Sequence, residues 1–129
     1  EGDTFARCLL SILKTVPHLA AVQGMGLATL WQIVRSSGYD TALQNSLIED
    51  GVIRHLMENR EYAKQNSALA RVVIGCALSI AMDNANAQKQ MTDKRNALPK
   101  RIVRILGIHG DIDYKGEFKP LNEWLMNNA

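Results

Sequence analysis

The sequence predicts an all-α protein, built as a short helical solenoid in which successive helices stack side by side. Three observations predict this fold. Apolar residues recur at i, i+3, i+4 and i+7 in most segments, which is typical of helices with one buried face. No segment alternates apolar and polar residues cleanly, as a half-buried strand would. The order of long and short helical segments also repeats along the chain, which is typical of solenoids.

The amino-acid composition is consistent with a core made by helices. Of the 129 residues, 47% are hydrophobic but only 5% are aromatic, so the core must consist mainly of Leu, Ile, Val, Ala and Met. A β-sandwich would use more β-branched and aromatic residues. The length suits one domain, and residues 1–129 are expected to form a single helical domain. Because the chain begins at Glu1 without a Met, this domain is expected to be a fragment of a longer solenoid.

Two helices are predicted in the first 38 residues. The first covers about residues 4–15. The second begins near Pro17, because proline is common in the first turn of a helix, and it ends at Gly38. Its apolar stripe follows helical spacing and consists of Leu27, Leu30, Trp31 and Val34.

Two short helices are predicted after this long one. Thr41 and Gln44 have the spacing of a capping box, in which each side chain bonds the other residue's backbone. Gly51 separates the two helices, because glycine tolerates the left-handed backbone that a sharp turn requires. The helices are expected over residues 42–50 and 52–60, followed by a polar linker over 61–66.

The second half of the chain repeats this order of elements. The segment from Ser67 to Asp83 is apolar on nearly all sides, so it is predicted to be buried on more than one side. Pro99 opens a later helix, which Gly107 is expected to end. The remaining elements are a short polar helix over 87–93, a loop over 108–117 and a last helix over 118–127.

Two parts of the chain share one order of motifs. Their strings are Leu27-Ala28-Thr29-Leu30 with Leu43–Ile53, and Cys76–Ala81 with Gln88–Asp93 and Asn96-Ala97-Leu98-Pro99. Both parts resemble the armadillo repeat, a family in which a long helix rich in Ala and Leu precedes a short helix, and a Gly-Ala-Leu/Ile-Pro turn then begins the next helix. The string Ile48-Glu49-Asp50-Gly51-Val52-Ile53 is the most similar to the family.

The matched turns of the two copies lie at Gly51 and Asn96. They are about 45 residues apart, a spacing typical of both armadillo and HEAT repeats. Asn96 is expected to adopt the left-handed backbone in the second copy, because asparagine tolerates it better than most residues. The resemblance covers about residues 5–107 and implies an armadillo-like α-α superhelix of about two repeats. A HEAT-like or another helical array stays an alternative.

The resemblance implies a protein-interaction module of the scaffold, adaptor or chaperone type. Its ligand would be a peptide or helix of another protein, bound along a groove that the long helices line. The residues expected in this groove are Gly24, Ala28, Gln32, Arg35, Val72, Cys76 and Ile80. Nuclear-import members of the family carry a Trp and, four residues later, an Asn there, and this chain has neither. Basic import peptides are therefore not expected as ligands.

Trp31 lies one residue away from the family's tryptophan position. One residue turns a side chain by about 100° around a helix. Trp31 can therefore pack in the core or lie exposed near the groove with Gln32 and Arg35, and the sequence leaves both interpretations open.

A basic patch is the clearest charged feature of the sequence. It consists of Lys89, Lys94, Arg95, Lys100, Arg101 and Arg104, with Asp93 as the one acidic residue between them. The patch is either a solvated face or a docking site for acidic peptides, and a binder of acidic surfaces or nucleic acid is the alternative function. Nucleic acid is not the expected partner, because no interleaved aromatic residues indicate base stacking and the net charge is only +2.

No pattern in the sequence indicates an enzyme. The three histidines, His18, His55 and His109, lie far apart and form no metal-binding spacing. No metal and no cofactor are therefore expected. Cys8 and Cys76 both lie in apolar helical patterns and are expected to be buried, reduced thiols. A small α-helical enzyme stays an alternative that would require a pocket with several titratable side chains.

The longest apolar run without charge, residues 72–82, is far shorter than the roughly 20 residues that cross a bilayer. A soluble cytoplasmic protein without a membrane partner is therefore expected. Because about two repeats bury little surface, the chain is expected to stack on further repeats or to self-associate through an exposed end.

Overall fold

The computed structural model describes residues 2–110, 114 and 116–129, and all regular structure in these residues is helical. This confirms the prediction of an all-α fold. The elements are α1 (Gly2–Thr15), α2 (Ala20–Ser36), α3 (Thr41–Glu49), α4 (Val52–Glu58), α5 (Arg60–Gln65), α6 (Ser67–Ala81), α7 (Ala85–Thr92), α8 (Leu98–His109), the 3-10 turn η1 (Lys119–Leu121) and α9 (Asn122–Asn127).

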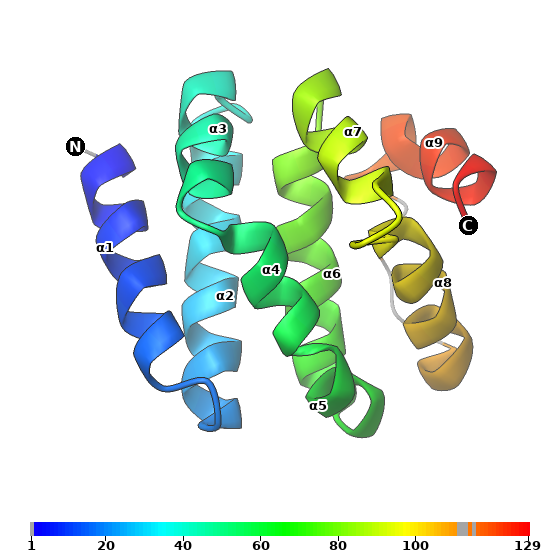
Figure 1. The fold of residues 1–129 in the computed structure, drawn as a ribbon, viewed down its shortest axis with the longest axis horizontal. Helices are drawn as coiled ribbons and strands as arrows, with labels where there is room; N and C mark the ends of the chain where they lie inside the picture. The colour runs from blue at the N-terminus through cyan, green and yellow to red at the C-terminus, as the bar shows by residue number, and fades with distance from the viewer. Residues whose placement is uncertain (1, 111–113, 115) are drawn as a thin grey trace.

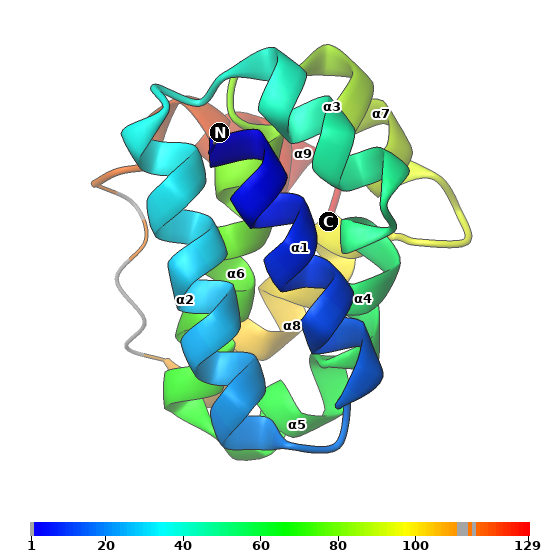
Figure 2. The ribbon, with the colours of Figure 1, turned by 90° about the vertical axis from the view of Figure 1, so that its left-hand side faces the viewer.

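The helices stack along one direction in two layers. Figure 1 shows α1 at one end of the stack and α8 with α9 at the other, with α3, α4 and α7 in front of the long helices α2 and α6. In Figure 2 the same two layers are seen from the α1 end. One layer therefore consists of long helices and the other of short ones.

Helix α6 is the centre of the core. Every residue from Val73 to Ala81 is buried, because α6 packs against α2, α5, α7 and α8. This confirms that the segment is buried on more than one side. Two glycines allow neighbouring helices to approach closely, since a Cβ at Gly75 would clash with the ring of Trp31, and one at Gly26 would clash with Leu13.

The two matched turns adopt left-handed backbone, but only one does so at the predicted residue. Gly51 has φ = 89° and begins α4, as expected. In the second copy the left-handed residue is Ala97, with φ = 46°, and the prediction for Asn96 is wrong. Asn96 instead uses its side-chain amide to donate to the carbonyl of Gln90 at 2.7 Å. This contact fixes Asn96 before the turn and moves the strained position one residue later.

The residues between Arg60 and Asn66 form a helix, and the prediction of a polar linker is wrong. Most residues of α5 are good helix formers, and its Ala63 is fully buried. Helix α8 also continues past Gly107 to His109, and its C-cap Gly110 has a φ of 76°. The predicted last helix, residues 118–127, is split into η1 and α9. The predicted loop over 108–117 lies partly outside the described residues.

The capping box predicted for Thr41 and Gln44 does not form. Asp40 is the N-cap of α3 and accepts a hydrogen bond from the backbone N–H of Leu43 at 2.9 Å. The side chain of Gln44 points into the interior instead, where it donates to backbone carbonyls at the end of α6. A buried glutamine therefore replaces the local cap with a contact between helices.

Candidate functional site

The structure divides the predicted groove residues into two groups. On α2, Gly24 and Ala28 are half-buried, while Gln32 and Arg35 are exposed. On α6, Val72 is half-buried, but Cys76 and Ile80 have no exposed surface. The prediction that Cys76 and Ile80 line an open groove is therefore wrong, since α6 lies inside the stack and turns these side chains toward its neighbours.

A cluster of polar and aromatic groups lies on the open side of α2 and α6. We call it the Trp31 cluster, and it consists of Trp31, Arg35, Tyr39, Arg71, Glu117 and Phe118. The carboxylate of Glu117 accepts hydrogen bonds from the Trp31 indole N–H at 3.0 Å and from the Tyr39 hydroxyl at 2.6 Å. It also forms an ion pair with the Arg35 guanidinium at 3.0 Å. Three donors from α2 and the turn after it thus hold one carboxylate.

The indole of Trp31 is the platform of this cluster. The ring is buried against Gly75 of α6 and lies 6.0 Å, centroid to centroid, from the buried ring of Phe118. The guanidinium groups of Arg35 and Arg71 lie 5.4 and 5.5 Å from its centroid, within the range of cation–π attraction. Trp31 therefore packs in the core and still presents its N–H to the surface.

The titration behaviour of the cluster follows from these contacts. Burial, together with the hydrogen bond to Glu117, raises the pKa of Tyr39 to about 12. Burial alone would raise the pKa of Glu117, but the hydrogen bonds from Tyr39, Trp31 and Arg35 outweigh it and lower that pKa below its usual value. At neutral pH the cluster therefore holds an ionised carboxylate against neutral and cationic donors.

Tyr39 reaches Glu117 from a strained backbone. It follows Gly38, and its φ of 57° lies in the left-handed region, which costs a non-glycine residue about 1–2 kcal/mol. The turn from α2 to α3 therefore places Tyr39 in a backbone conformation that is unfavourable for tyrosine, while its side chain makes a favourable hydrogen bond to Glu117. Neither Tyr39 nor Glu117 can be recognised as a site residue from the sequence, because 78 residues separate them and no local pattern connects them.

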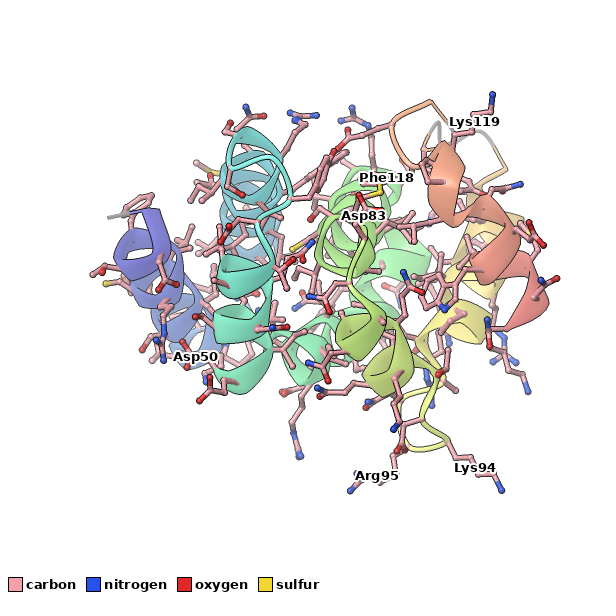
Figure 3. The ribbon with its side chains drawn as sticks, turned by 90° about the horizontal axis from the view of Figure 1, so that it is seen from above. Asp50, Asp83, Lys94, Arg95, Phe118 and Lys119 are labelled. Atoms are coloured by element: carbon pink, nitrogen blue, oxygen red, sulfur yellow. The ribbon has the colours of Figure 1, made fainter. Side chains whose placement is uncertain are left out.

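Two residues of the basic patch, Lys94 and Arg95, lie on the opposite side of the molecule from Phe118 of the Trp31 cluster. In Figure 3, Lys94 and Arg95 project from one edge, while Phe118 and Lys119 lie at the other. Five of the six patch residues are exposed, and Arg101 is half-buried. Arg95 lies 3.4 Å from Asp93, which neutralises it in part.

Two further arginines adjoin the basic patch. Arg54 of α4 and Arg60 of α5 line a cavity of about 380 Å³ together with Arg95 and Arg101. The other lining residues are Met57, Glu58 and Asn96. The sequence did not indicate this arrangement, because Arg54 and Arg60 precede the patch by about one repeat and approach it only when the helices stack.

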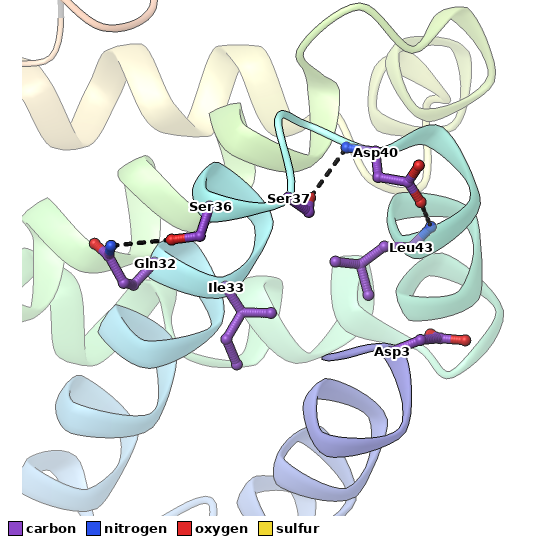
Figure 4. A pocket seen from close by; sticks show the side chains of 7 residues that line it. All are labelled: Asp3, Gln32, Ile33, Ser36, Ser37, Asp40 and Leu43. Carbon is purple, nitrogen blue, oxygen red and sulfur yellow. Dashed lines mark hydrogen bonds between the residues drawn. The ribbon is translucent and has the colours of Figure 1, made fainter. Parts of the chain in front are cut away.

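A separate cavity of about 490 Å³ lies where α1, α2 and α3 meet. Figure 4 shows its lining side chains, among which the predicted groove residue Gln32 bonds Ser36 at 3.2 Å. Its carboxylates are Asp3 and Asp40, and Asp40 already caps α3. Of its two serine hydroxyls, that of Ser36 accepts from Gln32, and that of Ser37 donates to the carbonyl of Val34 at 2.6 Å.

The outer side of α1 and α2 is apolar. Five of the eight large hydrophobic side chains exposed in the described chain lie on these helices or between them: Phe5, Ile12, Leu19, Val22 and Met25. Met25 is 74% exposed. A groove of about 280 Å³ lies here, and four of its lining residues come from α2. It is lined by Leu9, Ile12, Leu13, Val22, Met25, Gly26 and Thr29. This end of the stack carries an apolar surface of the kind that marks interaction sites.

The two cysteine thiols lie in different environments. Cys76 is buried, and burial raises the pKa of its thiol to about 12, so it stays protonated at neutral pH. Cys8 is exposed, and the prediction that both thiols are buried is wrong for it. Among the residues that the structure describes, no group of three His, Cys, Asp or Glu side chains is placed to hold a metal ion.

Comparison with known proteins identified no relative. No family model, no curated protein and no solved structure matches the chain. None of the described helices combines the length and the apolar character needed to cross a membrane.

Proposed function

We propose that this chain is a protein-interaction module of the armadillo type that binds a partner segment on the open face of its long helices, α2 and α6. One observation carries the proposal. That face already holds an acidic and an aromatic side chain, Glu117 and Phe118, which come from a distant part of the chain. A surface with this chemistry is suited to bind the same pair of side chains from another protein.

The armadillo assignment is supported by the order of the helices. A short helix α3, a broken helix α4–α5 and a long helix α6 follow one another, and α7, α8 and α9 begin the same order again. Left-handed residues at Gly51 and Ala97 make the matching turns. The scaffold, adaptor and chaperone roles all require such a surface, and cytoplasmic location stays part of the proposal.

The contacts of the Trp31 cluster define the ligand that we propose. Arg35, Tyr39 and the indole N–H of Trp31 supply hydrogen bonds to a carboxylate, while the indole face packs against an aromatic ring. The proposed ligand is therefore an extended peptide with Glu or Asp next to an aromatic residue. Because Glu117 occupies the donors, a partner must compete with it, which lowers the apparent affinity of the free chain.

Selection from a random peptide display library tests this function. The bait is the chain with Glu117→Gln, which leaves the donors without their carboxylate and weakens the hold on the segment that carries Phe118, so that a ligand can displace both side chains. We expect enrichment of peptides with an acidic residue beside an aromatic one. Selected peptides should bind this variant more tightly than the unmodified chain, as measured by fluorescence anisotropy.

The matched control is the double variant Glu117→Gln with Arg35→Gln, which removes the cation that pairs with the ligand. We expect it to lose the selected peptides, while Glu117→Gln with Arg54→Gln, a change of equal charge on the other side of the molecule, should keep them. Circular dichroism confirms that each variant is folded. The proposal is wrong if no acidic–aromatic motif is enriched, or if the Arg35 and Arg54 variants bind equally well.

The apolar side of α1 and α2 favours a second function, self-association through this end of the stack. A second copy would cover Ile12, Val22 and Met25, whose exposure to water is unfavourable. Sedimentation velocity over a range of concentrations would detect the dimer. We expect Met25→Lys to abolish it and Met126→Lys, an equally drastic change near the other end, to leave it intact. A monomer at every concentration would exclude self-association.

The alternative function, binding of acidic surfaces or nucleic acid through the basic patch, is favoured by the cavity where Arg54 and Arg60 join the patch. Its ligand would meet four guanidinium groups on the side opposite the Trp31 cluster. The two binding surfaces are separate, so one chain can carry both.

A further inference from the structure

We propose that the cavity between α4, α5 and α8 is a binding site for the phosphoryl group of a phosphorylated serine or threonine on a partner protein. It combines four arginines in a volume of about 380 Å³ with a single carboxylate, Glu58, in its lining. The site lies apart from the Trp31 cluster, and the inference rests on the alternative function of the basic patch, whose ligand it names. We call it the arginine pocket.

Two of the four arginines are held in place by the backbone. Arg60 donates from Nη1 to the carbonyl of Met57 at 2.7 Å. Arg101 donates from Nε to the carbonyl of Asn96 at 2.9 Å. Both side chains are half-buried. An arginine has five N–H donors, so each anchored guanidinium keeps several for a ligand. Anchoring also reduces the conformational entropy that ligand binding would otherwise cost.

The anchored arginines form no ion pair with any carboxylate of the described residues. Glu58 lies 3.8 Å from Arg54, and the nearby Glu61 pairs with Lys64 at 3.1 Å. Arg54 and Arg95 are the exposed members, with side chains 89% and 90% exposed, and Arg95 pairs with Asp93 at 3.4 Å. The pocket thus presents two anchored cations and two exposed ones, and its four arginines outnumber the carboxylates of Glu58 and Asp93.

A phosphoryl group fits this arrangement better than the other anions of proteins or nucleic acids. It carries nearly two charges and three acceptor oxygens, and planar guanidinium groups bind such oxygens in pairs. A glutamate or aspartate has one charge and would satisfy only part of the pocket. Binding of single-stranded nucleic acid requires a long basic groove and aromatic side chains that stack with the bases. No aromatic residue lines this cavity.

Chemical-shift mapping by NMR with small probes tests the inference on the whole chain. The main probe is a capped tripeptide with a central phosphoserine. The comparison probes are the same tripeptide with glutamate, inorganic phosphate, and single-stranded oligothymidine. We expect the phosphoserine tripeptide to shift the signals of Asn96 and of the Arg101 Nε–H. We also expect it to bind at least about fivefold more tightly than the glutamate tripeptide, because it offers more charge-assisted hydrogen bonds.

The decisive variants change charge equally at two places on the same side. The double variant Arg60→Gln/Arg101→Gln should lose at least about tenfold in affinity for the phosphoserine tripeptide. Lys100→Gln/Arg104→Gln, on the same helix α8 but outside the cavity lining, should change it by less than about threefold, as expected for exposed charges. If the first double variant does not fold, Arg54→Gln/Arg95→Gln replaces it, because both side chains are largely exposed.

Four results would overturn the inference. Equal affinities for the phosphoserine and glutamate tripeptides would show that the pocket does not recognise the phosphoryl group specifically. Equal losses in the two double variants would reduce the effect to general electrostatics. Tighter binding of inorganic phosphate than of the tripeptide would assign the site to the free ion. Tighter binding of oligothymidine, lost in both double variants, would assign the face to nucleic acid. None of these results bears on the Trp31 cluster.

Discussion

Gln23 and Gln44 hold together two junctions between helices in the same way, but with different neighbours. Gln23, on α2, donates from its amide to the carbonyls of Leu13 and Val16 at the end of α1, at 3.0 and 2.9 Å. Gln44, on α3, donates to the carbonyls of Ser79 and Met82 at the end of α6, both at 2.9 Å. Each glutamine thus satisfies carbonyls that the end of a helix leaves without partners.

The two junctions differ in the groups that donate hydrogen bonds to the glutamine oxygen. At Gln23 it accepts from the His55 ring at 2.6 Å and from Asn59 at 3.3 Å, and the buried Asn59 Oδ1 has no partner. At Gln44 it accepts from Asn84 at 3.0 Å, while the Asn84 oxygen caps α7. One junction therefore contains an ionisable ring and an unsatisfied acceptor, and the other consists of amides whose groups are all used.

This difference shows how two glutamine junctions of the same kind can respond differently to pH. Buried amide networks change little with pH, because amides do not titrate in the physiological range. A buried imidazole can be protonated, and its charge would be costly in the interior. We therefore expect the Gln44 junction to dominate stability and the Gln23 junction to determine how stability responds to acid.

The largest expected effect is the loss of Gln44. Gln44→Leu keeps the approximate volume but leaves two buried carbonyls without partners, and the amide of Asn84 keeps only its bond to Asn45 at 3.1 Å. Each such group costs about 1–3 kcal/mol, so we expect the free energy of unfolding to fall by about 3 kcal/mol or more. Gln23→Leu should cost less, because its bond to Val16 is only partly buried and water can replace it. Urea denaturation measures both changes.

Gln65→Leu is the control for these two variants. Gln65 is an exposed residue at the end of α5, so its replacement should change the free energy of unfolding by no more than about 0.5 kcal/mol. Equal losses of unfolding free energy for Gln23→Leu and Gln44→Leu would show that water does not replace the lost bond to Val16.

The sequence was sufficient to predict most helices because their signals are local. Apolar spacing identified α2 and α6, and Gly51 identified a turn whose geometry only glycine tolerates easily. Helix α5 was missed because its polar residues, such as Lys64, were interpreted as a linker, although they are good helix formers. The role of Gln44 was also missed, because its carbonyl partners are 35 and 38 residues away.

The candidate sites were harder to predict than the fold, for a physical reason. Arg35 and Arg101 could be named from the sequence as exposed or basic positions, but their partners Glu117 and Arg60 come from other helices or from the loop before α9. Cys76 was assigned to a groove from family spacing, whereas packing on several sides of α6 buries it. Spacing predicts which residues share a helix face, but the packing of neighbouring helices decides whether that face is open.

A smaller effect distinguishes a helix cap from a connection between helices. Asn84 and Asn66 both cap a helix, with side-chain oxygens that accept from Ala87 and Leu69, but only Asn84 also bonds Gln44. Asn66→Ala should cost about 1 kcal/mol, the usual value of a lost cap. Asn84→Ala should cost about 1 kcal/mol more, because the buried oxygen of Gln44 loses its donor. Equal losses in urea denaturation would mean that the contact with Gln44 contributes nothing.

The smallest expected effect is the response to acid, and it depends on His55. This side chain is only 2% exposed, and burial, reinforced by the positive charge of Lys14, lowers its pKa below 6.5 despite the opposing charge of Glu58. Since Gln23 uses its amide for the two carbonyls, its oxygen must accept from His55 Nε2–H. The neutral ring is thus the form that fits the folded chain.

The unfolded chain therefore binds a proton at His55 before the folded chain does. Stability from the neutral ring is fully present above pH 6.5, and it is lost as the pH falls from there through the lower pKa of the folded state. The slope cannot exceed about 1.4 kcal/mol per pH unit for one group. Urea midpoints at several pH values should show this loss. His55→Gln should reduce the slope, whereas His18→Gln, at an exposed position, should leave it unchanged. An unchanged slope in His55→Gln would place the acid response elsewhere and remove the functional difference between the two glutamine junctions.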